Sequence, residues 1–163
     1  MDKMIVDEWM KFAENDLAVV HILSNHHPMQ LEIICYHCQQ ATEKALKAYL
    51  LYKDKEPPKT HDLKALVDLC IEVSPEFSEI ITECEYLSPF GVQPRYPFSF
   101  ELEDSDATTS TQKSEQILEF IKEKIIYDIE EDIPTQDEIN AIGIGRTEIA
   151  QGETLDHDDI NWD

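Results

Sequence analysis

The sequence predicts an all-α protein: an up-and-down bundle of about five helices, followed by an acidic, partly helical carboxyl-terminal extension. Three observations lead to this prediction. The chain of 163 residues has only four glycines, and its eight prolines gather at a few places, which favours long helices with definite ends. Between these breaks, apolar residues recur every three or four positions, the spacing of one helix face. After residue 127 the composition becomes strongly acidic.

The first two helices are expected to form an antiparallel pair. Apolar residues from Val6 to Leu23 repeat at helical spacing, and the polar run at residues 24–27 ends that pattern. Pro28 is expected to start the second helix, because proline lacks the amide that a first-turn residue leaves unbonded. This helix should reach about Tyr52. Two long helices joined by a short link pack antiparallel.

Two shorter helices are expected after the double proline at residues 57–58. Thr60 is the predicted cap of a third helix that begins near Leu63, since its hydroxyl can accept a backbone N–H. Ser74 and Pro75 restart the chain, and a fourth helix is expected from Phe77 to Leu87.

A loop and a fifth helix complete the predicted bundle. Prolines and a glycine between residues 89 and 97 exclude regular structure up to about Phe100. Ser105 or Asp106 is the predicted cap of the fifth helix, whose isoleucines and leucine between residues 117 and 126 should pack against the other four. The bundle domain is therefore placed at residues 1–127 and the extension at 128–163.

The net charge of -22 limits the classes of partner. So negative a chain should not bind DNA or anionic membranes through non-specific attraction, and a basic protein partner is more natural. The amino end does not have the order of a secretion signal, and no apolar run approaches the roughly 18 residues of a membrane span. We expect a cytoplasmic location.

The four cysteines are expected to be small buried side chains of the helices. Cys35 and Cys38 form a C-x-x-C with His37 between them. Zinc sites generally need a second ligand pair, and redox motifs of this kind lie beside a strand. The sequence therefore predicts no metal ion and no cofactor.

A polar stripe on the second helix is the strongest functional signal. His37, Gln40, Lys44 and Lys47 are separated by three, four and three residues, so they share one side of a helix. A solvated face with a local Glu43–Lys47 pair explains the same pattern. The next turn carries Thr60-His61-Asp62, and the loop before the fifth helix carries Arg95.

These motifs resemble the HEPN family. The runs Q-Q-A-T-E-K-A-L-K at residues 39–47 and P-K-T-H-D-L at residues 58–63 are similar to recurrent HEPN signatures, and the likeness spans roughly residues 4–127. The resemblance implies a homodimeric helical bundle that contacts a nucleotide or RNA. The residues that it points to, with the rest of the stripe, are His37, Gln40, Lys44, Lys47, His61 and Arg95.

Ribonucleases of this family carry an arginine followed after four to six residues by a histidine. Arg95 and Arg146 are the only arginines here, and neither has a histidine in that window. No catalytic residue is therefore assigned. A pairing in space of Arg95 with His61 or His37 stays open as an alternative.

The extension at residues 128–163 has its own character. Twelve Asp and Glu stand against one Arg, a balance of -11 (1 − 12). Thr135 and Glu138 form a capping box for a short helix to about Ala150. The segment is similar to the acidic carboxyl-terminal segments of type II antitoxins, which implies a basic protein partner such as a toxin. Its predicted partner-binding residues are Ile139, Ile142, Arg146, Ile149, Leu155 and Trp162.

Three functions follow from the sequence. The first is a non-catalytic HEPN-type module that binds nucleotide or RNA, or regulates a partner, in a toxin–antitoxin or nucleotidyltransferase-linked system. The second is a metal-independent ribonuclease with a non-standard Arg/His pair. The third is a structural dimerisation module whose polar stripe is a solvated face or part of the interface.

Overall fold

The fold is all-helical, as the sequence predicts. The computed structural model describes residues 3–91, 101–131 and 140, and these described residues contain no strand. By its contacts the chain divides into two units, Met1–Ile126 and Tyr127–Asp163, and the fold below is that of the first. Its elements are α1 (Lys3–Ser24), α2 (Leu31–Tyr52), α3 (Leu63–Val73), the 3-10 helix η1 (Pro75–Ile80), α4 (Ile81–Leu87), the 3-10 helix η2 (Ser88–Gly91) and α5 (Asp104–Glu131).

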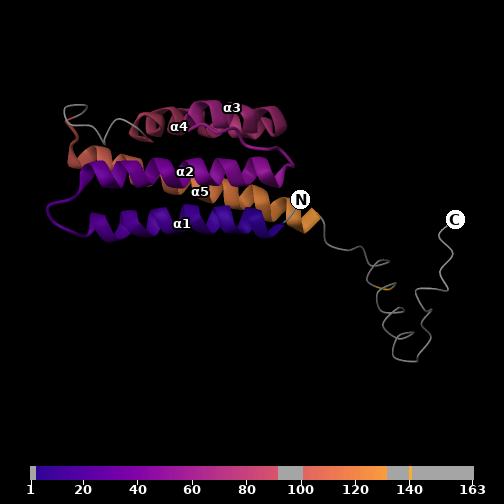
Figure 1. Cartoon of the computed structure of the whole chain (residues 1–163), viewed down its shortest axis with the longest axis horizontal. Helices are drawn as coiled ribbons and strands as arrows, with labels where there is room; N and C mark the ends of the chain where they lie inside the picture. Colours follow the sequence, from indigo (N-terminus) through magenta and orange to yellow (C-terminus); the bar gives the residue numbers. More distant parts are fainter. Residues whose placement is uncertain (1–2, 92–100, 132–139, 141–163) are drawn as a thin grey trace, which may run out of the picture. The chain divides into compact units, whose positions relative to one another are not determined.

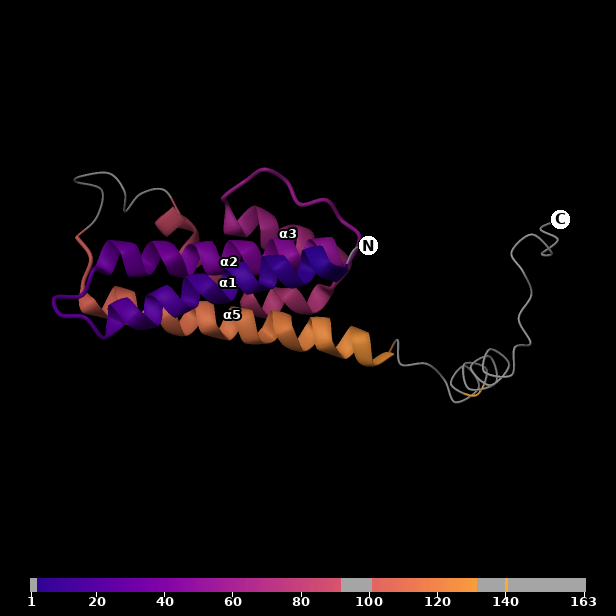
Figure 2. The same ribbon diagram turned by 60° about the horizontal axis from the view of Figure 1, so that its bottom comes forward.

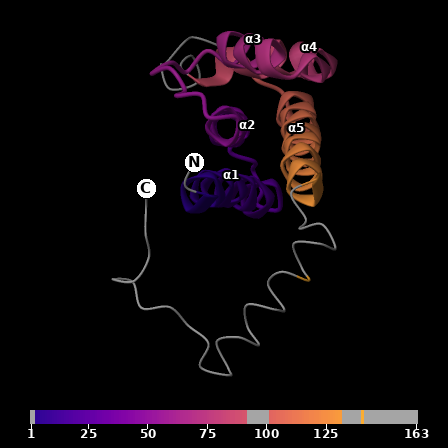
Figure 3. The same ribbon diagram turned by 90° about the vertical axis from the view of Figure 1, so that its right-hand side faces the viewer.

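Helix α2 is the central element. It runs antiparallel to α1, and α1, α2 and α5 lie lengthwise side by side (Figures 1 and 2). Seen from the end, α2 lies between α1 and the layer of α3 and α4, with α5 along one flank (Figure 3). This position explains why α2 is buried on most sides, including polar positions such as Gln39, Glu43 and Lys47. A charged residue on α2 must therefore find its partners inside the bundle.

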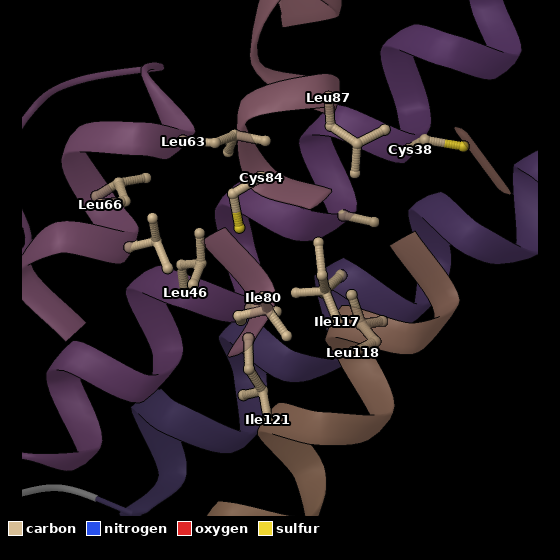
Figure 4. Packing of buried hydrophobic residues seen from close by; sticks show 14 of the residues in the cluster. Cys38, Leu46, Leu63, Leu66, Ile80, Cys84, Leu87, Ile117, Leu118 and Ile121 are labelled. Atoms are coloured by element: carbon tan, nitrogen blue, oxygen red, sulfur yellow. The ribbon is translucent and has the colours of Figure 1, made fainter. Parts of the chain in front are cut away.

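The core joins all layers (Figure 4). Leu46 of α2 lies among Leu63 and Leu66 of α3, and Ile117 and Ile121 of α5 approach from the other side. Aromatic rings extend the same core. The ring of Phe77 lies 4.2 Å from that of Tyr49 and 5.1 Å from that of Phe120, between centroids. The apolar spacing of each helix thus buries one continuous face.

A seam of small polar side chains joins α2 to α5. Thr42 and Ser114 are fully buried, and both hydroxyls donate to the backbone carbonyl of Cys38, at 3.0 and 2.9 Å. The buried Ser110 hydroxyl donates to the sulfur of Cys35 at 3.5 Å. Small side chains allow the two helices to approach closely, and every hydroxyl in the seam has an acceptor.

The predicted cap of the third helix is wrong. Asp62, not Thr60, is the N-cap of α3, because its carboxylate accepts from the backbone N–H groups of Lys64 and Ala65. The Thr60 hydroxyl accepts instead from the N–H of Asp62, at 3.1 Å. An aspartate directly before the first helical residue is better placed to reach the free N–H groups than a threonine two residues earlier.

Three other predicted boundaries also move. Helix α2 begins at Leu31 rather than Pro28, which follows a cis peptide bond. Helix α4 begins at Ile81, because Pro75–Ile80 forms the tighter 3-10 helix. Helix α5 begins at Asp104, so neither Ser105 nor Asp106 precedes it as a cap. Asp106 instead accepts the backbone N–H of Glu103, at 2.9 Å.

Several sequence predictions lie outside the described residues. They are Arg95 with its loop, the capping box at residues 135–138, and the six partner-binding residues Ile139, Ile142, Arg146, Ile149, Leu155 and Trp162. Their roles therefore stay predictions. Among the residues that are described, no helix combines the length and the apolar character that a membrane span requires.

Candidate functional site

A buried glutamate is the centre of the polar site. Glu43 Oε1 accepts from Lys47 Nζ at 2.8 Å, and Oε2 accepts from Gln39 Nε2 at 3.2 Å. The Nδ1 atom of His61, from the turn before α3, lies 3.1 Å from each carboxylate oxygen. Gln40 completes the group by donating to the Gln39 side-chain oxygen at 2.7 Å. We call these five residues the Glu43 cluster.

Glu43 is held as an anion. Burial alone raises the pKa of its carboxyl, but the hydrogen bond and charge of Lys47, with the donors of Gln39 and His61, outweigh burial, and the net pKa is lowered. Only 6% of the Glu43 side chain and 10% of the Lys47 side chain are exposed. Lys47 also lies over the ring of Trp9 from α1, 6.0 Å from its centroid. Lys47 therefore neutralises Glu43 from inside the bundle.

His61 is the exposed member of the Glu43 cluster, with 71% of its side chain accessible. A carboxylate can only accept, so Nδ1 must carry the proton in the pair with Glu43. Nε2 then lacks a proton in the neutral ring and is available as an acceptor or a base. The ring is further positioned through its own backbone, because Gln39 Nε2 donates to the His61 carbonyl at 2.9 Å.

A second carboxylate organises the rest of the stripe. Asp16 of α1 faces α2, where its Oδ1 accepts from His37 Nδ1 at 2.8 Å and its Oδ2 accepts from Lys44 Nζ at 2.5 Å. One quarter of the His37 and Lys44 side chains is exposed, against 14% for Asp16. We call these three residues the Asp16 cluster.

The structure therefore brings together the five described members of the predicted site, but in two groups. Gln40, Lys47 and His61 gather around Glu43, while His37 and Lys44 gather around Asp16. Each of the two lysines is paired with a carboxylate, so the stripe is not a patch of uncompensated positive charge.

Sequence reasoning missed the two carboxylates as organisers, and it missed Gln39. A signal was present for each. Asp16 falls at the helical spacing of the buried Ala13, Leu17 and Val20, so an acid there must face a partner helix. Gln39 and Glu43 are four residues apart, as are Glu43 and Lys47, which aligns an amide, an acid and a base along one row.

The cysteines offer no reactive thiol. All four are buried and unpaired. Burial raises the pKa of Cys38 and of Cys84 to about 12, and it raises those of Cys35 and Cys70 as well. Thiols with such pKa values are protonated at neutral pH and are poor nucleophiles. No group of three or more His, Cys, Asp or Glu side chains in the described ranges is arranged to hold a metal ion.

A groove of about 300 Å³ lies elsewhere, between α1 and α5. Its floor is apolar, and pairs cross it near both ends: Lys122 Nζ to Glu14 at 2.6 Å, and His21 Nε2 to Glu115 at 3.3 Å. Glu119 adds a third carboxylate to its lining. This acidic groove is unsuited to a phosphate, in contrast to the two clusters on α2.

Comparisons of the sequence and of the fold with known proteins point to the same family. A sequence model of the HEPN domain matches residues 6–125. The chain is also 30% identical, over 132 residues, to the Methanocaldococcus jannaschii protein named "Putative toxin MJ1304". That alignment covers 71% of this chain and 84% of the relative.

Two solved structures share the fold. TT1696 from Thermus thermophilus superposes with a TM-score of 0.61 at 20% identity, over 73% of this chain and 97% of that one. ST0689, described as an archaeal HEPN homologue, superposes with a TM-score of 0.59 at 24% identity, over 74% of this chain and 97% of that one. At these identities the likeness establishes the arrangement of helices.

Proposed function

Because this chain belongs to the HEPN domain family, we propose that it is a non-catalytic regulatory module that binds a nucleotide or an RNA end. The observation that carries the proposal is the Glu43–His61 pair. A buried, ionised carboxylate holds an exposed imidazole in one orientation, and no other described His pairs with so deeply buried an acid. A fixed imidazole beside a lysine–glutamate pair is suited to a phosphate group, which accepts hydrogen bonds and favours a protonated ring.

The roles of the predicted residues differ within this proposal. Lys47 is nearly buried and already neutralises Glu43, so it supports the site rather than contacting the ligand. Contact then falls to His61, the exposed member of the Glu43 cluster. Since the Glu43–Lys47 pair has no net charge, a phosphate at His61 meets little local repulsion on a chain of net charge -22.

Calorimetric titration with ADP and with a short RNA tests this role. His61→Ala should weaken binding by about tenfold or more, the value of one lost charged hydrogen bond. His21→Ala is the matched control, because His21 also pairs with a carboxylate, Glu115, but at the α1–α5 groove. Equal affinities for the wild type and His61→Ala would contradict the assignment.

Ribonuclease activity is a second candidate function, which the contact of Glu43 with Nδ1 of His61 favours. A carboxylate bound to Nδ1 of an exposed histidine is the arrangement that prepares Nε2 for proton transfer in many hydrolytic enzymes. RNA cleavage by the purified chain, abolished by His61→Ala and by Arg95→Ala with the fold intact, would establish this function. Absence of cleavage by the wild type would leave the binding role.

We also propose that the chain forms a homodimer and acts in a toxin–antitoxin or nucleotidyltransferase-linked system. Met4, Phe12 and Ile22 expose large apolar side chains on α1, which supports an interface between copies. The relative named as a toxin supports the system. The acidic residues 128–163 are the proposed contact for a basic partner.

Sedimentation velocity tests the dimer, which a monomer at micromolar concentration would contradict. Titration with the product of an adjacent gene tests the partner contact. Binding that weakens with salt and with Trp162→Ala would support the acidic extension as its site.

A further inference from the structure

The groove between α1 and α5 is formed by two matching rows of side chains. The lining residues are Glu14, Leu17, Ala18 and His21 of α1, and Glu115, Leu118, Glu119 and Lys122 of α5. In each row the residues are separated by three, one and three positions, which places them on one face of a helix. Lys122 pairs with Glu14 and Glu115 pairs with His21, so the rows run in opposite directions, as the two helices do in Figure 2. The groove therefore extends over about 10 Å, or two helical turns.

The floor of the groove is apolar and continues onto an exposed side chain. Leu17 and Leu118 are buried beneath it, whereas Ala18 is exposed and offers only a methyl group. The volume of about 300 Å³ is at the lower end of the range for binding sites. Ile22 follows Ala18 by four residues, so it lies on the same side of α1, and 70% of its surface is exposed. The apolar surface thus extends past the cavity, which suits a polypeptide segment better than a small molecule.

The rim of the groove is acidic. Three glutamates against Lys122 give the lining a balance of -2 (1 − 3) when His21 is neutral. Glu14 and Glu115 are paired, but about half of each side chain is exposed, and ion pairs with that exposure are weak. Glu119 has no ion pair with any residue that the structure describes. All three carboxylates can therefore accept from an incoming cation at little cost.

We infer that the α1–α5 groove docks an amphipathic basic helix of another protein, with lysine or arginine on both sides of a leucine-like stripe. Charge selects this occupant. The extension at residues 128–163 has a balance of -11 and a second copy has a net charge of -22, so the acidic rim repels both. An apolar stripe laid between two helices is a common mode of peptide recognition. The inference is independent of the proposed site at His61, which shares no residue with the groove.

Fluorescence anisotropy with a labelled synthetic peptide, LKKLLKKLLKKL, tests the inference on the full chain. Its leucines recur every three or four residues, whereas the control peptide LKLKLKLKLKLK has the same composition without a helical stripe. The wild type should bind the first peptide about tenfold or more tightly than the second. Glu119→Lys should weaken that binding about tenfold, because repulsion replaces attraction. Ala18→Trp should weaken it about as much, because the indole fills the space above the two leucines.

A matched control and two further outcomes complete the test. Glu72→Lys makes the same change of charge at an exposed position of α3, outside the groove, and should change the affinity less than about threefold. If Ala18→Trp does not fold, Glu119→Lys decides the question. Failure of the wild type to bind the first peptide, equal binding of the two peptides, or equal losses in Glu119→Lys and Glu72→Lys would overturn the docking site. A dimer in sedimentation velocity that Ala18→Trp dissociates would assign the groove to a second copy and would also overturn it.

Discussion

The two carboxylates on either side of the α1–α2 contact have the same kinds of partner but different surroundings. Glu43 lies inside the bundle with four donors, and its histidine is 71% exposed. Asp16 is more accessible, has two donors, and holds a histidine that is only one quarter exposed. The more deeply buried acid therefore holds the more exposed histidine, and the more accessible acid holds the less exposed one.

This contrast predicts that the two acids contribute differently to stability. A buried acid with several donors stabilises the fold while it aims an exposed ring outward. A partly exposed acid contributes less to stability, because water competes for both partners. We therefore expect changes at Glu43 to lower the free energy of unfolding more than changes at Asp16 do.

The largest effect is expected from Glu43→Gln. The substitution keeps the shape but leaves Lys47 buried without an anion, which should lower the free energy of unfolding by about 3 kcal/mol. Urea denaturation measures it. His61→Ala is the matched comparison, since removal of an exposed partner should cost less than about 0.5 kcal/mol. Equal losses in the two variants would contradict the assignment of stability to the buried acid rather than to the exposed ring.

At low pH, the free energies of unfolding of Glu43→Gln and of the wild type should become equal. The folded-state pKa of Glu43 lies below its ordinary value of 4.5, because the donors of Lys47, Gln39 and His61 outweigh the opposing effect of burial. Its stabilisation is therefore complete above pH 4.5 and is lost as the pH falls through the lower folded pKa. Unfolding curves of both proteins between about pH 7 and pH 3 should converge at the acid end, and parallel curves would show that the lowered pKa has no role.

Gly91→Ala should have an intermediate effect, transmitted through Gln39. A Cβ atom at residue 91 would lie 2.8 Å from the side-chain carbon and 2.9 Å from the nitrogen of the Gln39 amide. That amide donates both to Glu43 and to the His61 carbonyl, so it cannot move without loosening the cluster. We expect a loss of about 2 kcal/mol by urea denaturation. In a Gln39→Ala background, which gives the Cβ room, Gly91→Ala should cost little further stability, and an undiminished loss there would contradict this route.

Asp16→Asn should have the smallest effect on stability, about 1 kcal/mol, since His37 and Lys44 can turn towards water. Thermal unfolding gives the measurement. Asp68→Asn is the control: Asp68 pairs with Lys64 in an exposed setting, so no resolvable change is expected. A loss at Asp16 as large as that at Glu43 would remove the distinction between the two clusters.

The sequence predicts the helices better than it predicts the site. Apolar spacing located the helical segments, because one buried face imposes its period on the residues. The boundaries at Pro28, Thr60 and Phe77 were wrong, since a cap or a 3-10 turn depends on which donor lies nearest in space.

The histidines and lysines of the site could be read from one helix face and one turn. Helical spacing marks Asp16 and Glu43 as candidates, but their partners could not be read, because Asp16 meets His37 from another helix and His61 reaches Glu43 from the turn before α3. Long-range pairing of this kind is set by helix packing, which periodicity alone does not specify.

The hydroxyl seam between α2 and α5 has a consequence for assembly of the bundle. Apolar contacts alone tolerate sliding, whereas Thr42 and Ser114 meet at the single Cys38 carbonyl. A slip of α5 by one turn would take the Ser114 hydroxyl away from the Cys38 carbonyl of α2, and it would move Lys122 and Glu115 away from Glu14 and His21. The seam therefore fixes the register of α5 along α2. Apolar packing alone would permit several positions of α5 along its axis, and the hydrogen bond of Ser114 selects one of them.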